Sequence, residues 1–349
     1  MPTQHQETGL LTLSTEIEAS ETWPTLLSTA TTKIDKYKPL GHTLEDILVP
    51  SLKAFLAWLP PGGRESIARD IEQTTTDQEL YDVFHNLLTG LAVLMKARSK
   101  PSTVTPSPHA KRRANVETVA ASVDQPNSRD ATFAALCRRR DNDRCVITGE
   151  MDTKACEGLG FPEGIDFGPT EGAHIIPFAY ASWDKSTASP EDNLSAWEIL
   201  YRCFPLLRKP GGVNAESINN ISNGITLQDY VHTQFGQFAI ALQPTDQIHR
   251  YQVKYYKRYP SRLRQHLPAY VELKAANDAQ DLALPNPDFL DCHYRLAEIL
   301  NASGMAESIE QHFQDWDDIK ALSSEGLRED GATDIARILE AGLWERVIG

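Results

Sequence analysis

Two histidines and an asparagine, far apart in the chain, have side chains that could transfer protons or bind a metal ion. His174 lies in an apolar stretch just before Pro177, Asn223 precedes a glycine, and His232 follows in a short predicted helix. A histidine exchanges protons near neutral pH, and its neutral ring can bind a metal ion. Proline ends a strand, so the His174 ring can sit at a strand tip. The pattern therefore predicts a proton-transfer or metal site.

The elements that must position these residues are two strands and a helix. We predict one strand leading to His174, a second over 224–227 and a helix over 228–235. Asp229 and His232 are three residues apart and hence share a helix face. Glu171 lies two residues before Ala173 and faces the same side of the strand. The carboxylate of Asp229 can therefore lie beside His232, and that of Glu171 on the strand face of Ala173.

The rest of the chain divides into helical flanks and a linker. Residues 1–98 read as a helical region, in which Thr76 and Glu79 form a predicted capping box ahead of a helix. The buried face of that helix is predicted to comprise Leu80, Phe84, Leu87, Leu91 and Met95. Residues 99–128, with four prolines, read as a linker. The central domain is predicted to span 129–266 and an acidic helical region 267–349.

Within the central domain, several local patterns predict further elements. A short helix is expected over Ser128–Arg140, and a strand over Cys145–Thr148. Residues 182–222 read as a long polar insertion with one helix near Leu194–Leu200 and a turn at Pro210. Such a long loop inside a compact domain is usually functional or disordered.

Charge is distributed unevenly. The net charge of −14 is a poor global match to a polyanion, but residues 100–145 and 237–266 carry net charges of +4 and +5 and bracket the histidines. The second segment interleaves tyrosines with the predicted nucleic-acid contacts Arg250, Lys254, Lys257 and Arg258. The alternative is an edge strand protected by charge, with half-buried tyrosines. Arg140 either complements the end of its helix or contacts phosphate beside the site.

Composition excludes some classes of protein. No apolar run reaches the length of about 18 residues that a membrane span requires. The first residues lack the basic and apolar parts of a secretory signal. Five cysteines, without zinc-knuckle spacing, favour a reducing compartment. We therefore expect an intracellular protein, cytoplasmic or nuclear, with no membrane partner.

The ordered series His174, Asn223 and His232, together with Cys145–Gly149 upstream, resembles the HNH nuclease family, most closely its fungal members. The resemblance covers roughly residues 129–258. It implies an α+β fold with a central ββα-metal unit flanked by helical regions, and a divalent ion, Mg²⁺ or similar. It also implies hydrolysis of DNA or RNA, with His174 as general base, Asn223 as the central asparagine and His232 as metal ligand.

The chain departs from the family pattern at two ligand positions. The residue before the base is often a metal ligand, and here it is Ala173. A second helix ligand would fall on Gly236, which has no side chain. Glu171 and Asp229 could substitute for them. Two other functions stay open: an enzyme acting on a small molecule with His174 as acid or base, possibly in fungal secondary metabolism, and a catalytically silent binding module.

Overall fold

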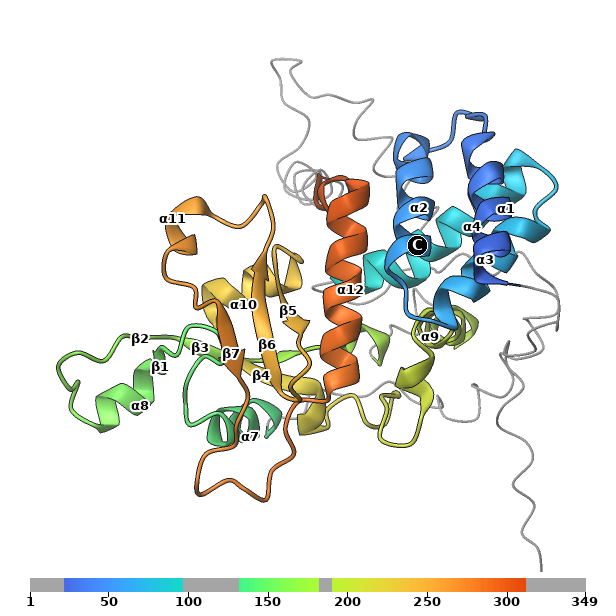
Figure 1. The fold of residues 1–349 in the computed structure, drawn as a ribbon. Helices are drawn as coiled ribbons and strands as arrows, with labels where there is room; N and C mark the ends of the chain where they lie inside the picture. The colour runs from blue at the N-terminus through green and yellow to red at the C-terminus, as the bar shows by residue number, and fades with distance from the viewer. Residues whose placement is uncertain (1–21, 97–131, 182–189, 312–349) are drawn as a thin grey trace, which may run out of the picture.

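The structure is a computed structural model that describes residues 22–96, 132–181 and 190–311. Helices make up the N-terminal part and the last described segment, and small sheets lie between them in the sequence (Figure 1). The protein therefore belongs to the α+β class, as the sequence predicts. No helix within the described ranges combines the length and apolarity that crossing a membrane requires.

The N-terminal part is a bundle of helices that share one apolar core. Its elements are α1 (Trp23–Asp35), a 3-10 turn (Glu45–Ile47), α2 (Leu48–Trp58), α3 (Gly63–Gln73), α4 (Asp77–Leu87), a π-helical stretch (Leu88–Val93) and α5 (Leu94–Lys96). The capping box of α4 is confirmed, because Glu79 N donates to Thr76 Oγ1 and Thr76 N to Glu79 Oε2, both at 3.2 Å. The predicted apolar face is buried at every position.

Three small sheets follow. Their strands are β1 (Met151–Asp152) with β2 (Phe167–Gly168), β3 (Thr170–His174) with β4 (Gly224–Gln228), and the sheet β5 (Ile240–Pro244), β6 (Arg250–Tyr255) and β7 (Tyr270–Glu272). β3 and β4 are antiparallel, with His174 opposite Gly224. Helix α10 (Asp229–Gly236) starts directly after β4. The predicted strands and helix around the histidines are therefore present, in the order strand, strand, helix.

Helix α7 (Phe133–Arg140) packs against the β3–β4 pair at very short range. Two glycines allow this approach. A Cβ atom on Gly172 would lie 2.7 Å from the Cα atom of Ala134, and one on Gly224 would lie 2.5 Å from Cys137 Sγ. One face of the strand pair is thus covered by α7.

The N-terminal helical bundle and the β5–β6–β7 sheet meet at α12 (Pro287–Ser303). In Figure 1 this helix lies between the N-terminal bundle and the β5–β6–β7 sheet, and it contacts α2 and β5. Helix α9 (Pro190–Cys203) packs against α3 and the π-helical stretch. The remaining short elements are α8 (Thr153–Gly158), α11 (Ser261–Arg264) and 3-10 turns at Phe178–Tyr180, Pro205–Arg208 and Ile221–Asn223.

Three predictions need correction. Residues Cys145–Thr148 form a tight turn rather than a strand, closed by Gly149 N donating to Cys145 O at 2.9 Å. The helix predicted near Leu194–Leu200 is present as α9, but it belongs to the core and not to a polar loop, because Trp197 and Leu200 are buried. β6 is the middle strand of its sheet, so the edge-strand alternative is wrong.

The predicted linker over 99–128, Ser128, and the C-terminal region beyond residue 311 lie outside the described residues. All five cysteines lie within them, and all are buried and free of disulfide bonds.

Candidate functional site

Glu171 and His232 form a carboxylate–imidazole pair on the surface. Glu171 comes from the middle of β3 and His232 from the second turn of α10. His232 Nδ1 lies 2.5 Å from Glu171 Oε2. The two side chains are 57% and 37% exposed, so solvent and a large substrate can reach them. Among the described residues, no hydrogen-bond partner is recorded for Nε2 of His232. The pair thus presents an oriented imidazole nitrogen to solvent.

His174 has different surroundings. Its ring stacks face to face on Phe133 of α7, with centroids 3.9 Å apart and planes 8° from parallel. Nε2 lies 3.1 Å from Oδ1 of Asn219, in the segment before β4. Phe178 flanks the ring at 5.8 Å. The half-buried His174 is therefore held by packing and hydrogen bonding.

Asn223 is part of the scaffold. Its side chain is fully buried, and Oδ1 accepts a hydrogen bond from Ile176 N at 2.8 Å. Nδ2 donates to Ile176 O and to Ile218 O, each at 3.0 Å. The asparagine thus fixes the backbone after β3, a role that the resemblance implies. Its predicted place among the catalytic residues stays a prediction, and its complete burial favours a positioning role.

The two predicted site histidines point to different sides of the β3–β4 pair. Side chains alternate along a strand, so Glu171 and His174, three residues apart, face opposite sides. His174 lies on the side that α7 covers, whereas Glu171 reaches His232 on the other side. The structure therefore brings together Glu171 and His232, but does not bring His174 to them.

The donor set does not fit a metal ion held by three protein ligands. Within the described ranges, no His, Cys, Asp or Glu side chains form a group of three or more that could hold an ion. Asp229 does not complete the Glu171–His232 pair, and its Oδ1 accepts a hydrogen bond from Tyr230 N at 2.5 Å. Ala173 is buried. The sequence departures at 173 and 236 are thus not compensated in the described part of the chain.

Arg140 is a structural cation. It is fully buried and binds Asp141 with two parallel hydrogen bonds of 2.8 and 2.9 Å. Its remaining donors reach the carbonyl oxygens of Ile221, Gly224 and Ala283 at 2.9, 2.8 and 3.3 Å. Its predicted contact with nucleic acid is therefore wrong, because no donor is left for a phosphate at the surface.

The basic residues of β6 and the following turn divide into two kinds. Lys254 forms an ion pair with Glu298 of α12 and lies 5.8 Å from the Trp58 ring centroid, and Arg258 donates to Ala306 O at 3.0 Å. These two bind the sheet to the helices, so they are poor phosphate ligands. Arg250 and Lys257 are exposed. Their predicted role as nucleic-acid contacts stays a prediction.

Sequence reasoning missed the partners of His174. Asn219 lies in an irregular segment, where no periodicity indicates which side chains turn inward. Phe133 lay in a predicted helix, but its position over the strand pair was not inferred. The signal was available in Gly172 and Gly224, since glycine inside a strand often marks a close approach by another element.

Comparison with known proteins supports an HNH-type segment. Residues 145–243 match the sequence profile of the HNH endonuclease family. The matched segment contains β3, β4 and α10 and ends within β5. Searches among curated proteins and among solved structures found no match to the chain.

Proposed function

We propose that the protein hydrolyses phosphodiester bonds of nucleic acid, with the Glu171–His232 pair as its acid–base centre. One observation carries this proposal. In the segment that matches the HNH endonuclease family, the strand–strand–helix unit presents an exposed, carboxylate-oriented imidazole. General acid–base catalysis needs such a proton acceptor within reach of an attacking water.

The chemistry follows from the orientation of the ring. Glu171 accepts the Nδ1 proton of His232, which leaves the Nε2 lone pair available toward solvent. Nε2 removes a proton from water, the hydroxide attacks phosphorus, and the 3′ oxygen leaves and takes a proton from solvent. The charge of Glu171 stabilises the imidazolium that forms. The carboxylate therefore acts by positioning, and His232 by proton transfer.

The sequence assigned these roles differently, with His174 as base and His232 as metal ligand. The contacts of His174 favour a scaffolding role. Since the donor set of the described residues does not fit a three-ligand ion, no step of the proposal depends on a metal. Metal dependence, and kinship with fungal HNH-domain proteins, stay predictions from the sequence.

The first experiment asks whether the purified protein cleaves nucleic acid. Plasmid DNA and single-stranded RNA are incubated with wild type, with Glu171→Gln/His232→Gln and with His42→Ala, each with EDTA or with Mg²⁺. His42 is an exposed histidine of the N-terminal part and serves as the matched control. We expect a loss of about 10²- to 10⁴-fold in the double variant, the usual contribution of general acid–base catalysis, and no loss in the control.

The outcomes separate the competing functions. Cleavage by the double variant at the wild-type rate removes the pair from the mechanism. Absence of cleavage by wild type under all conditions contradicts the proposal and favours the silent binding module or the small-molecule enzyme. Cleavage that EDTA abolishes and Mg²⁺ restores would show that catalysis depends on a metal ion.

A further inference from the structure

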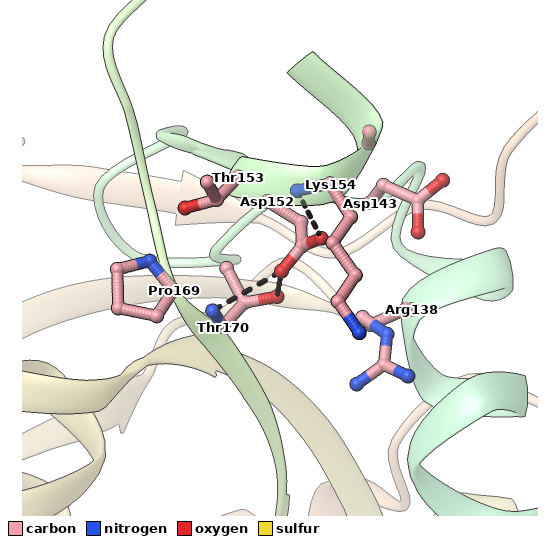
Figure 2. A pocket seen from close by; sticks show the side chains of 8 residues that line it. Arg138, Asp143, Asp152, Thr153, Lys154, Pro169 and Thr170 are labelled. Carbon is pink, nitrogen blue, oxygen red and sulfur yellow. Dashed lines mark hydrogen bonds between the residues drawn. The ribbon is translucent and has the colours of Figure 1, made fainter. Parts of the chain in front are cut away.

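A pocket lies beside β3, on the side of the strand pair that α7 covers. Its volume is about 680 Å³. Its walls come from α7, the turn after it, the start of α8 and the start of β3, and the lining residues used below are Arg138, Asp143, Asp152, Thr153, Lys154 and Thr170. Figure 2 shows the Lys154 side chain extending toward the Arg138 guanidinium. Two cations from separate elements thus converge on one hollow.

Neither cation is neutralised by a bonded partner. Within the described residues, neither side chain forms an ion pair or a hydrogen bond, although the charge of Arg138 acts on the nearby Asp143 carboxylate. By contrast, their neighbour Arg139 donates to Asp278 O at 2.8 Å, and Arg140 is saturated. Arg138 is half-buried and Lys154 is exposed. The pocket therefore offers a guanidinium fork and an ammonium group to an incoming anion.

The two carboxylates of the pocket differ in their availability. Asp152 is engaged, since Oδ1 accepts from Lys154 N at 3.0 Å and Oδ2 from Thr170 N and Oγ1 at 3.2 and 2.8 Å. These hydrogen bonds lower the pKa of Asp152 against the effect of its burial. Burial, followed by the charge of Asp152, raises the pKa of Asp143. Both carboxylates oppose a bound anion, but only Asp143 can be changed without breaking the hydrogen bonds that Asp152 makes.

The pocket adjoins the acid–base pair. Thr170 lines the pocket, and Glu171 is the next residue of β3. β3 pairs with β4 alone, so its other edge carries no strand within the described residues. A polyanion lying across that edge could reach the pocket on one side of β3 and Glu171 on the other.

We propose that Arg138 and Lys154 bind a backbone phosphate next to the one that is cleaved, and so hold the nucleic-acid chain across β3. This inference rests on the proposed function, because it names a second contact of the same substrate. The Thr153 hydroxyl, which also lines the pocket, is available as a further donor. Phosphate is the ligand class because a guanidinium fork and an ammonium group match its oxygens.

The test is the salt dependence of nucleic-acid binding. Binding of a labelled oligonucleotide, single-stranded and duplex, is measured at several salt concentrations in the His232→Gln background, where the proposal expects no appreciable cleavage. Each lost phosphate contact should lower the slope of log affinity against log salt by about 0.7 for single strands and 0.9 for duplex. Because the two cations bind the same phosphate, Arg138→Gln/Lys154→Gln should lower the slope by about one such contact. The control Lys36→Gln/Lys38→Gln removes two exposed cations from the N-terminal part and should leave the salt slope unchanged.

A third variant should change the affinity for nucleic acid in the opposite direction. Asp143→Asn removes one of the two opposing carboxylates, so it should tighten binding by about two- to fivefold, the effect of one partly screened charge. General damage to the pocket would weaken binding instead. An equal salt slope with and without Arg138→Gln/Lys154→Gln in the His232→Gln background, or weaker binding by Asp143→Asn, overturns the inference.

Failure of the phosphate site can be told apart from failure of the proposed hydrolytic function. If wild type does not cleave but the slope depends on Arg138 and Lys154, the phosphate site stands and the hydrolytic function falls. If wild type cleaves and the slope does not depend on them, the site falls alone. If inorganic phosphate competes with a dye at the pocket while no oligonucleotide binds even at low salt, a free phosphate group is the ligand and the nucleic-acid assignment is overturned.

Discussion

The two sides of the β3–β4 pair have opposite chemical characters. On the α7 side, His174, Asn223 and Arg140 have protein partners, and the last two are fully buried. On the other side, Glu171 and His232 are bonded to each other and remain exposed. The comparison teaches that two histidines of one strand–strand–helix unit can differ in availability, since His174 is held by protein partners whereas the His232 ring is exposed.

The largest effect on the scaffold side is expected at Arg140. Replacing Arg140 by Met leaves Asp141, 4% exposed, without its cation. Breaking a buried ion pair in this way costs about 3–5 kcal/mol of the free energy of unfolding. Urea unfolding of the variant measures the loss. An unchanged urea midpoint of unfolding together with weaker nucleic-acid binding would mean that Arg140 contacts the substrate. The two sides of the β3–β4 pair would then not differ in the way described.

A smaller effect is expected at His174. The change His174→Ala removes a stacked ring pair and a hydrogen bond, each worth about 0.5–1.5 kcal/mol, so we expect a loss of about 1–3 kcal/mol in stability. Cleavage per folded molecule should stay near the wild-type rate. The measurement combines thermal unfolding with activity corrected for the folded fraction. A variant of wild-type stability that has lost cleavage would restore His174 as the base.

The smallest effect on stability is expected at a third histidine, His293. It is buried and so serves as a reference for a histidine that solvent cannot reach. His293 of α12 lies between Phe235 and Phe238, with ring centroids 3.6 and 4.5 Å away, and Nε2 bonds Phe235 O at 3.0 Å. Burial lowers the pKa of His293 to about 3. Protonation therefore favours the unfolded chain, where the pKa is about 6.5.

The contribution of His293 is fully present above about pH 6.5 and falls by about 1.4 kcal/mol per pH unit as the pH drops toward 3. Urea unfolding at pH 7 and pH 5.5 should thus show a shallower pH dependence in His293→Leu than in wild type. An equal pH dependence of stability in the two proteins would mean that the His293 imidazole is accessible to solvent. Burial in the structure would then be a poor guide to which histidines can take up a proton.

Much of the fold could be predicted from the sequence because its signals are local. The Thr76–Glu79 capping box and the buried face of α4 follow from spacing alone, and the β3, β4 and α10 elements from short apolar runs. The turn at Cys145–Thr148 could not be separated from a strand, because a four-residue apolar run suits either.

The candidate site was predictable in composition but not in arrangement. Glu171 and His232 could be named together as candidate metal ligands, because the family resemblance places His232 on the helix and strand alternation places Glu171 on the face of Ala173. Whether His174 joins them depends on α7, which covers one strand face through Gly172 and Gly224. The burial of Arg140 depends on carbonyl groups from two distant segments, around Ile221–Gly224 and at Ala283. Such tertiary contacts carry no local sequence signal.

Imidazole rescue tests the central claim most directly. The variants His232→Ala and His174→Ala each leave a space of imidazole size, and added imidazole can replace a ring whose role is proton transfer. We predict that His232→Ala regains cleavage in the presence of imidazole, with a dependence on imidazole concentration that Glu171→Gln weakens. His174→Ala, active per folded molecule, should gain nothing. Rescue of His174→Ala, with His232→Ala inert to imidazole, would contradict the assignment of Glu171–His232 as the acid–base centre.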